Sequence, residues 1–278
     1  MSTTSTPQSA STSAQTIPHG RFVWYDLMTS DPDAAQQFYT RIAGWGTQPW
    51  GDPGSYTMWT NDGAPLGGTV RLPDELIAQG IPPHWLAYVC VRNVDETIRE
   101  AEKLGGKAMH QPEDIPSVGR FAVLADPQGA ALAIFTPAED PPGHAGEPRL
   151  GEFSWHELMT TDYVAAFDFY KTLFGWEKIS DFDMGEMGMY HMFGQHVTVD
   201  GGLHGFPYGG MFNKTPDMPM PPNWMCYIQV SDVDETVALV KELGGQVLNG
   251  PMEVPGGDMI AQCLDPQGAA FAVHQRKA

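Results

Sequence analysis

The chain has few basic residues: 15 lysines and arginines stand against 34 aspartates and glutamates, for a formal net charge of −19 over 278 residues. Nucleic acids and anionic membranes are bound through a basic surface, which this composition does not supply. We therefore exclude both as partners and assign the acidity to solubility. Apolar residues make up 42% of the chain, and the length suffices for two domains with their own cores.

Cysteine is scarce as well. The three cysteines, Cys90, Cys226 and Cys263, are odd in number, which argues against a disulfide framework and favours a reducing compartment. Residues 1–19 begin with a Ser/Thr/Ala/Gln-rich stretch without a basic residue or an apolar run, so they resemble neither a signal peptide nor a membrane span. We predict a cytoplasmic protein with a disordered tail over 1–19.

Motifs for phosphate and dinucleotide binding are also missing, as is a nucleophile elbow. The glycine pairs Gly201-Gly202 and Gly209-Gly210 do not lie between a strand and a helix, so they do not indicate a phosphate site.

What the sequence does contain is a duplication. Segment 22–45, FVWYDLMTSDPDAAQQFYTRIAGW, returns at 153–176 as FSWHELMTTDYVAAFDFYKTLFGW, with 12 of 24 positions identical. The alternation over 22–28 predicts a strand. Ser30-Asp31-Pro32-Asp33 is typical of a capped helix start, and Gly44 is typical of a helix end.

A second segment repeats further along. WLAYVCVRNVDETIREAEKLGG at 85–106 matches 224–245 at 10 of 22 positions, and the offset grows from 131 to 139 residues, which we assign to an insertion within 194–207. The tetrapeptide DPQG at 126–129 predicts a hairpin turn and recurs in the second copy. Each copy thus reads as βαβββ–βαβββ, giving four such modules in the chain.

The predicted organisation is an α+β protein with two tandem domains. We place the first domain at 20–137, the second at 151–278, and a linker rich in proline and glycine at 138–150.

The strand–SDPDAAQQFY–GW opening, the VDET–LGG helix and the DPQG turn resemble the vicinal oxygen chelate superfamily, which includes glyoxalase I, bleomycin-resistance proteins, fosfomycin-resistance proteins and extradiol dioxygenases. The resemblance covers both copies and implies glyoxalase-like domains, in each of which two βαβββ modules form a curved sheet, or cup. In that family a divalent metal lies in the cup, held by His, Gln and Glu side chains.

The family's ligand positions can be tested one at a time. They correspond here to Trp24, Leu86 and Ala133 in the first copy and to Trp155, Met225 and Ala272 in the second. None of these side chains is a usual ligand of a divalent cation. We therefore predict no metal and no cofactor, which counts against standard glyoxalase I or dioxygenase chemistry.

Strand alternation predicts what faces the cup instead. Asp26 and Tyr88 in the first copy, and Glu157 and Tyr227 in the second, fall on the same side as the missing ligands. A carboxylate in an apolar wall has a raised pKa and can act as a general base. The alternative is a structural hydrogen bond to a neighbouring Trp or backbone N–H.

Further candidates for binding a ligand are the aromatic and small side chains that we expect around the acids. Core packing is the alternative for the tryptophans. The candidates are Trp24, Trp85, Trp155, Trp224, His191, Ala133 and Ala272.

Histidines are concentrated in the second copy. His191, His196 and His204, together with Glu157, define an alternative in which a non-standard divalent metal occupies the second domain. Their spacing matches no metal motif, and hydrogen-bonded or solvated histidines are the default interpretation.

Two classes of function follow. The first is a bleomycin-resistance-like protein that binds a small apolar or aromatic metabolite without metal. The second is a glyoxalase-like lyase or isomerase that acts on a small carbonyl compound, with Asp26 or Glu157 and Tyr88 or Tyr227 as acid–base groups. The expected partner is a small molecule, and the sequence leaves monomer and homodimer open.

Overall fold

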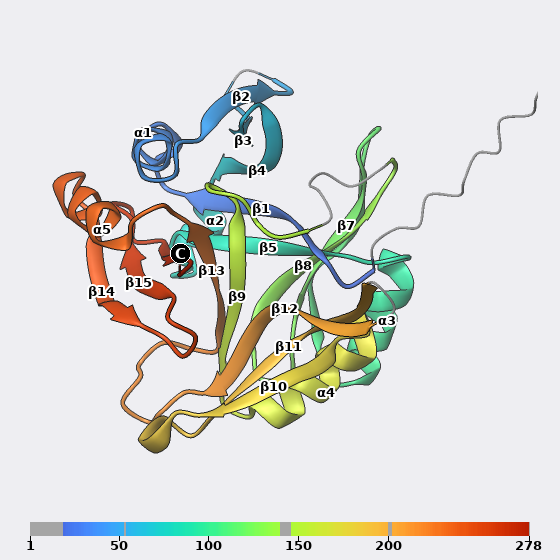
Figure 1. Ribbon diagram of the computed structural model, residues 1–278. Helices are drawn as coiled ribbons and strands as arrows, with labels where there is room; N and C mark the ends of the chain where they lie inside the picture. Colours follow the sequence, from blue (N-terminus) through green and yellow to red (C-terminus); the bar gives the residue numbers. More distant parts are fainter. Residues whose placement is uncertain (1–18, 53, 140–145, 200–201, 278) are drawn as a thin grey trace, which may run out of the picture.

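The computed structural model describes residues 19–52, 54–139, 146–199 and 202–277 (Figure 1). Apart from His19, the predicted disordered tail lies outside the described residues, and so does the middle of the predicted linker. Within the described part, two mixed eight-stranded sheets are present, and each is built from one half of the chain. The predicted pair of α+β glyoxalase-like domains is confirmed.

The first half contains two βαβββ modules and one extra short helix. Its elements are β1 (Phe22–Thr29), α1 (Pro32–Ala43), β2 (Gly46–Trp50), β3 (Tyr56–Asn61), β4 (Ala64–Arg71), α2 (Asp74–Ala78), β5 (His84–Cys90), α3 (Val94–Lys103), β6 (Lys107–Ile115), β7 (Gly119–Ala125) and β8 (Ala131–Pro137).

The second half repeats the two modules. Its elements are β9 (Phe153–Thr160), α4 (Tyr163–Phe174), β10 (Glu177–Asp183), the 3-10 turn η1 (Gly185–Met187), β11 (Met189–Val199), β12 (Gly202–Asn213), β13 (Asn223–Gln229), α5 (Val233–Glu242), β14 (Gln246–Glu253), β15 (Met259–Leu264) and β16 (Ala270–Gln275). The β11–β12 hairpin is longer than its counterpart β3–β4, which accounts for the predicted insertion.

The two sheets share one topology. The strand orders are β2-β3-β4-β1-β5-β8-β7-β6 and β10-β11-β12-β9-β13-β16-β15-β14. The first strands of the two modules, β1 and β5, pair antiparallel at the centre of the first sheet, and β9 and β13 do so in the second. The residues that line the middle of each sheet therefore come from the segments that the duplication repeats most faithfully.

Local chemistry sets the helix ends as the sequence predicts. The Asp31 side chain accepts from Ala34 N at 3.0 Å and α1 starts at Pro32, while Gly44 ends it at φ 72° in the left-handed region. Asn93 caps α3 in the same way by accepting from Glu96 N. Both caps satisfy backbone N–H groups that a helix start leaves unpaired.

The edge strands β2 and β6 and the helix α2 are not individually visible in the sequence. All of β2 is exposed and β6 is mostly so, so neither strand shows the alternation by which strands are recognised. β6 is covered only in part, by α3, and Ala108 is its residue that packs against the core.

Each sheet has two different faces. One face packs on the helices, and these packed faces of both halves join in one apolar core that includes Leu27, Phe38 and Trp59 from the first half and Phe174 and Trp176 from the second. The opposite faces carry separate apolar clusters. We call the face of the first sheet away from its helices cup 1, and the equivalent face of the second sheet cup 2.

The halves are joined by contacts that occur twice with their roles exchanged. Tyr39 OH donates to Asp265 Oδ2 at 3.2 Å, and its counterpart Tyr170 OH donates to Asp126 Oδ2 at 3.0 Å. The other oxygen of each aspartate accepts backbone N–H groups of its own DPQG turn. The hairpin turn thus also serves as half of the junction, in the manner of an interface between two symmetric subunits.

Two further contacts between the halves are repeated with the roles of the halves exchanged. Trp45 Nε1 donates to Gly151 O at 2.6 Å, and Trp176 Nε1 donates to Gly20 O at 2.7 Å. The helices follow the same symmetry: α1 lies beside α5 on one side of the molecule, and α3 lies beside α4 on the other (Figure 1).

One junction contact is placed where the two central strands meet. Tyr25 on β1 and its repeat counterpart His156 on β9 are 2.7 Å apart, from OH to Nε2. His156 Nδ1 lies 2.8 Å from the carbonyl oxygen of Tyr208; because a carbonyl only accepts, Nδ1 carries the proton and Nε2 accepts from Tyr25. Burial lowers the pKa of His156 to about 3, so this contact stays neutral.

All three cysteines are buried and free. None of the helices in the described part is both long and apolar enough to cross a membrane.

We expect Y39F and Y170F each to lower the free energy of unfolding by about 1–3 kcal/mol, because each leaves a buried aspartate oxygen and a tryptophan N–H without the hydroxyl. Urea denaturation followed by fluorescence measures this. Y163F serves as the control with a change within about 0.5 kcal/mol, because its hydroxyl makes no hydrogen bond to another of the described residues. Equal stabilities for all three variants would contradict the role of the junction.

Candidate functional site in the two cups

Cup 1 contains a carboxylate surrounded by neutral hydrogen-bond donors. Asp26 Oδ2 accepts from Tyr88 OH at 2.7 Å, and Oδ1 accepts from Tyr56 OH at 2.5 Å and from Trp24 Nε1 at 3.0 Å. Trp24 Nε1 also lies 2.9 Å from Tyr56 OH. The strand pairing brings these residues together, because Trp24 is opposite Tyr88 in the β1–β5 ladder.

Cup 2 repeats the arrangement with one change. Glu157 accepts from Tyr227 OH at 2.9 Å and from Tyr190 OH at 3.0 Å, and Trp155 Nε1 donates to Tyr190 OH at 2.8 Å. The longer acid is also bound by Gln262, whose Nε2 lies 3.1 Å from Glu157 Oε1 and 3.0 Å from Tyr227 OH. The equivalent position in the first copy is Val123, so the amide is specific to cup 2.

The pKa values of both acids are shifted for the same reason. Burial raises the pKa of Asp26, and the hydrogen bonds from Tyr56, Tyr88 and Trp24 offset only part of that rise. Burial likewise raises the pKa of Glu157 against its three donors. The phenols next to them, Tyr88 and Tyr227, have pKa values well above the usual range because they too are buried, so they remain donors.

Tyr56 and Tyr190 were not predicted as site residues. Each ring lies over a glycine of the neighbouring strand: a Cβ on Gly68 would lie 2.0 Å from Tyr56, and one on Gly210 would lie 2.0 Å from Tyr190. Gly68 pairs with Asp26 and Gly210 pairs with Glu157 in the sheet. The second glycine of each Gly-Gly pair therefore makes room for the tyrosine that reaches the acid.

The six positions that the family resemblance assigns to metal ligands lie around the two cups. Leu86 pairs with Asp26, and Ala133 lies opposite Tyr88; Met225 and Ala272 hold the matching places in cup 2. Both alanines are fully buried. Among the described residues, no group of three or more His, Cys, Asp or Glu side chains is arranged to bind a metal ion.

The structure corrects three predicted ligand-binding residues. Trp85 and Trp224 lie in the core on the helix side, where they donate to Tyr39 and Tyr170. Their strands alternate, so neighbours of the cup residues Leu86 and Met225 must face the other way. Trp24 and Trp155, by contrast, are half-buried and belong to the cups.

His191 also lies outside cup 2. Its neighbour Tyr190 faces Glu157, and His191 therefore points to the opposite side, where it packs on Phe167 of α4 and places Nδ1 2.7 Å from Asp181 Oδ1. His196 pairs separately with Glu177 at 2.6 Å. The two histidines have different acidic partners, so they do not converge with Glu157 as the alternative metal site requires.

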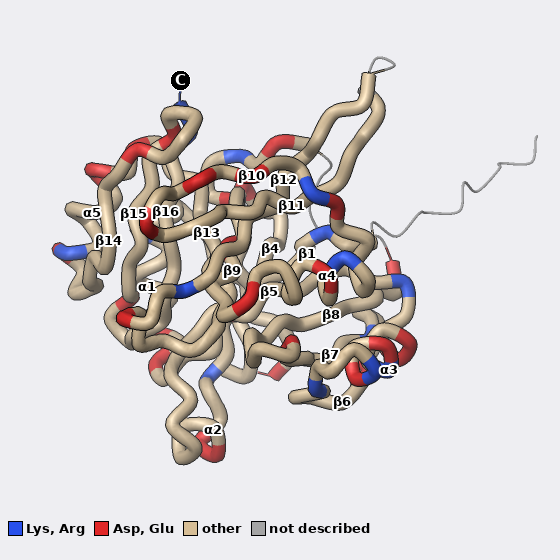
Figure 2. The backbone as a smooth tube through the Cα atoms, turned by 90° about the horizontal axis from the view of Figure 1, so that it is seen from below, with Lys and Arg blue, Asp and Glu red and all other residues tan. Residues whose placement is uncertain are grey.

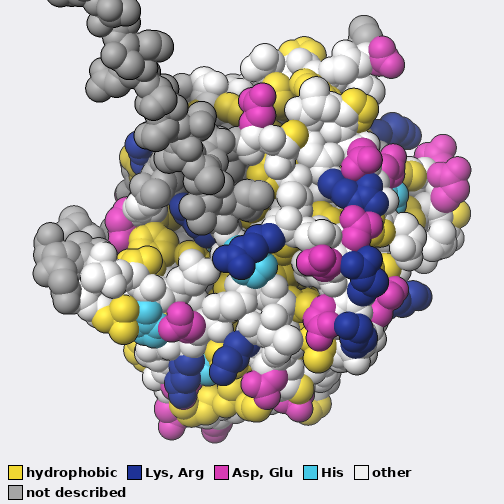
Figure 3. Space-filling view, turned by 90° about the vertical axis from the view of Figure 1, so that its right-hand side faces the viewer, with side chains coloured by type: hydrophobic (Ala, Val, Ile, Leu, Met, Phe, Trp, Pro, Cys, Tyr) yellow, Lys and Arg dark blue, Asp and Glu magenta, His cyan; other side chains and the backbone are white. Residues whose placement is uncertain are grey.

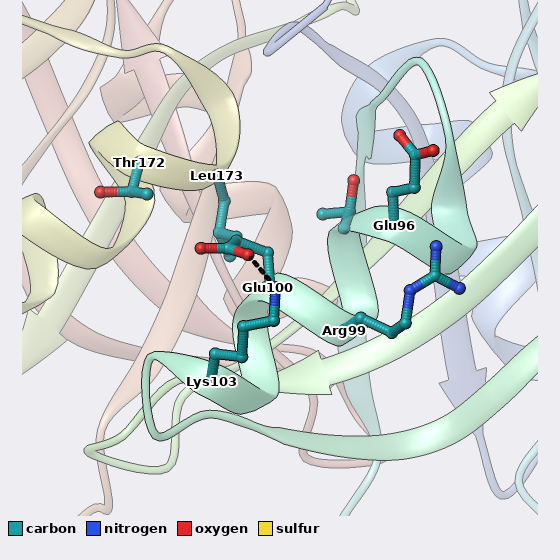
Figure 4. A pocket seen from close by; sticks show the side chains of 7 residues that line it. Glu96, Arg99, Glu100, Lys103, Thr172 and Leu173 are labelled. Carbon is teal, nitrogen blue, oxygen red and sulfur yellow. Dashed lines mark hydrogen bonds and ion pairs between the residues drawn. The ribbon is translucent and has the colours of Figure 1, made fainter.

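Two surface hollows lie away from the cups. One, of about 390 Å³, separates α3 from α4, with Glu96, Arg99, Glu100 and Lys103 on one wall and Thr172 and Leu173 on the other (Figure 4). The second, of about 340 Å³, lies at the equivalent seam beside α1. Both follow from the twofold arrangement of the helices, and neither contains a member of the two acid–tyrosine clusters.

The charges on the surface are mixed. Acidic segments occur in both halves, with the basic ones interspersed (Figure 2), and basic and acidic side chains intermingle on the face shown in Figure 3. On that face no continuous basic patch is seen, in keeping with the net charge of −19.

The fold and the cups together define the class of protein. The family model of the glyoxalase/bleomycin resistance protein/dioxygenase superfamily matches residues 150–273, and that of the glyoxalase-like domain matches residues 23–135. The chain belongs to this superfamily.

Two relatives are similar along most of their length. The putative glyoxylase CFP32 of Mycobacterium tuberculosis is 32% identical over 254 residues, covering 90% of this chain and 92% of that protein. The anthracycline biosynthesis protein DnrV of Streptomyces peucetius is 31% identical over 267 residues, covering 91% and 92%.

Solved structures share the fold. The Mn(II)-bound glyoxalase from Novosphingobium aromaticivorans superimposes with a TM-score of 0.60 at 16% identity over 93% of this chain and 82% of that one. The 2,3-dioxygenase LapB from Pseudomonas sp. KL28 gives 0.63 at 9% identity over 94% of each.

The raised pKa values of the cup acids predict a pH dependence of stability. A folded state that raises the pKa of an acid binds its proton more tightly than the unfolded state, so stability is greatest below the unfolded-state pKa and falls as the pH rises through the folded-state pKa. Both cup acids act in this direction. We expect the free energy of unfolding to fall less steeply from about pH 4 upwards in D26N and E157Q than in the wild type.

D95N is the control with the opposite sign, because the hydrogen bonds from Arg120 lower the pKa of Asp95. Ionised Asp95 stabilises the folded state, and this contribution grows as the pH rises. D95N should therefore have a lower free energy of unfolding than the wild type at neutral pH. Urea denaturation series across about pH 2.5 to 8 measure all three slopes, because the contribution of Asp95 changes only below the ordinary carboxyl pKa of about 4. Parallel profiles for D26N, E157Q and the wild type would contradict the assignment.

Proposed function

We propose that the protein binds a small apolar or aromatic metabolite in its cups without the family's metal. The observation that carries this proposal is the composition of the cups: a buried acid with tyrosine and tryptophan donors occupies the region where relatives in the superfamily hold an ion. Apolar walls with a few convergent polar groups are typical of ligand sites.

The chemistry of the cups suits an aromatic molecule. Trp24 and Trp155 are half-buried, so their rings are open to stacking from the cup side. Tyr88 and Tyr227 direct their protons at the acids, so their phenol oxygens can accept from a hydroxyl or N–H of the ligand; the Tyr227 oxygen does so alongside Gln262 Nε2, which already donates to it. A planar ring with one polar edge satisfies both groups.

The relatives support this choice. DnrV and its homologue DauV are named as anthracycline biosynthesis proteins, and anthracyclines are built on planar fused rings. The hollow between α3 and α4 is a poorer candidate, because charged side chains and no aromatic ring line it. We also propose that the protein is cytoplasmic and works as a monomer or a homodimer.

A second candidate is a glyoxalase-like lyase or isomerase acting on a small carbonyl compound. It is favoured by the raised pKa values of Asp26 and Glu157, which bring a carboxylate closer to the range of a general base, and by the relative named putative glyoxylase. In this mechanism the acid removes a proton next to the carbonyl, and a neighbouring tyrosine hydrogen-bonds the oxygen.

We expect hydroxylated anthraquinones to bind to chelator-treated protein, and Y88F and Y227F to weaken binding by about 3- to 10-fold each, which is the loss of one hydrogen bond. Quenching of tryptophan fluorescence measures the affinity. Y163F on α4 lies outside both cups and should leave it unchanged. Binding that disappears on chelation, or that neither cup variant alters, would contradict the proposal.

Turnover separates the two candidates. If the protein is a lyase, methylglyoxal with a thiol should be consumed, and D26N or E157Q should slow the reaction by about 10²- to 10⁴-fold, which is the usual contribution of a general base. If it only binds, consumption should equal the rate without protein. Loss of a hemithioacetal absorbance gives the rate.

A further inference from the structure

Cup 2 contains a second polar arrangement that the acid–tyrosine cluster does not use. Ser154 Oγ lies 2.8 Å from His274 Nδ1, and His274 Nε2 lies 2.9 Å from Asp258 Oδ2. The three residues come from β9, from β16 and from the turn before β15. A hydroxyl, an imidazole and a carboxylate in this order are the groups of an activated nucleophile.

The positions of the protons follow from the partners. Burial pushes the pKa of Asp258 up, but the Lys277 backbone N–H and His274 outweigh burial and lower it, so the carboxylate is an acceptor. His274 Nε2 must then carry the proton, and Nδ1 accepts from the Ser154 hydroxyl. Among the described residues, one other acceptor lies near that hydroxyl, the Tyr227 carbonyl oxygen, at the longer distance of 3.4 Å.

The first copy shows that the fold does not need the hydrogen-bonded series Ser154–His274–Asp258. At the equivalent positions it has Val23, Phe135 and Gly119. Val23 and Phe135 pack in one apolar cluster, and a Cβ on Gly119 would lie 2.6 Å from the Phe135 ring. The same space is thus filled by a valine and a phenylalanine in cup 1 and by a hydrogen-bonded chain in cup 2. Burying polar side chains where apolar ones fit does not add stability, which points to a function.

The hydrogen-bonded series runs from Ser154 in the cup to Asp258 at its rim. Ser154 precedes Trp155 at the irregularity where β9 pairs with β13, and its residue is 8% exposed. His274 lies two residues beyond Ala272 on the same face of β16, while the Asp258 side chain is 35% exposed. The counterpart of Ser154, Val23, lies in the apolar cluster of cup 1, so Ser154 faces the interior of cup 2 while the Asp258 carboxylate reaches solvent.

We propose that Ser154 is a nucleophile for acyl transfer from small esters in cup 2, with His274 as its base and Asp258 as the residue that orients the imidazole. Ser154 Oγ attacks the ester carbonyl carbon while its proton passes to His274 Nδ1. The C–O bond to the alcohol breaks and the alcohol oxygen takes that proton. Water then attacks the acyl group, its proton passes through Nδ1 to Oγ, and the acid leaves. Apolar neighbours such as Met225 and Ile260 favour an apolar acyl chain.

The test uses the full chain, a fluorophosphonate probe and p-nitrophenyl butyrate. We expect peptide mass spectrometry to find the probe on Ser154, and S154A and H274F to slow ester hydrolysis by about 10²- to 10⁴-fold, the usual share of a nucleophile–base pair. H274F is made together with D258G, because a Cβ at the Asp258 position would meet the new ring as it would at Gly119 in the first copy; the pair restores both first-copy residues. S180A removes a hydroxyl of the same sheet whose partner is the Met192 sulfur, and it should change neither readout.

Probe found elsewhere, no probe on Ser154, or hydrolysis that S154A leaves at the wild-type rate would each overturn the proposal. If Ser154 has only a structural role, the probe should not label it in the wild type. S154A should then lower the melting temperature and leave the labelled peptides unchanged. Because covalent labelling does not require an aromatic ligand in either cup, its failure is distinguishable from failure of the proposed binding function.

Discussion

The alternation of side chains along β1 and β9 is the constraint on which the rest of the structure depends. From Trp24 in β1 and Trp155 in β9 onwards, past an irregularity at the start of each strand, successive residues face opposite sides of the sheet. Tyr25 and His156 therefore face the shared core, where they join the two halves, while Asp26 and Glu157 face the cups. A shift of one residue would exchange these sets, so the junction between halves and the contents of the cups are fixed together.

The duplication explains both the shared and the divergent features of the cups. The junction requires that Tyr39, Tyr170 and the two turn aspartates keep reciprocal partners, which holds the central strands in equivalent positions in both halves. Within that frame the cup side chains can differ without altering the fold. Cup 2 has Gln262 and the buried His274 where cup 1 has Val123 and Phe135, so the second cup is the more polar of the two.

The sequence predicted the repeat, the helix caps, the turn and the two cup acids with their partners Tyr88 and Tyr227, because each depends on local pattern or on alternation within one strand. It did not predict Tyr56, Tyr190 or Gln262, which reach the acids from other strands whose register no local pattern reveals. The Gly67-Gly68 and Gly209-Gly210 pairs were the available signal, since a missing Cβ opposite an acid leaves room for a ring.

Two kinds of error had different causes. Trp85 and Trp224 were assigned to the cups by composition, although the alternation that placed Leu86 and Met225 there assigns their neighbours to the core. His191 was assigned because histidines are concentrated in the second copy, although His191 and His196 have separate acidic partners outside cup 2. The edge strands were missed because exposed strands carry no apolar pattern.

The central claim is that the cups hold an aromatic molecule by ring stacking and a buried acid, in the place where relatives hold an ion. A crystal structure of the protein grown with a hydroxylated anthraquinone, with anomalous data collected to locate metals, tests this most directly. We predict density for a planar ligand against Trp24 or Trp155 and no anomalous peak within either cup. A cation coordinated by cup side chains, or a ligand bound only in the hollow between α3 and α4, would contradict the claim.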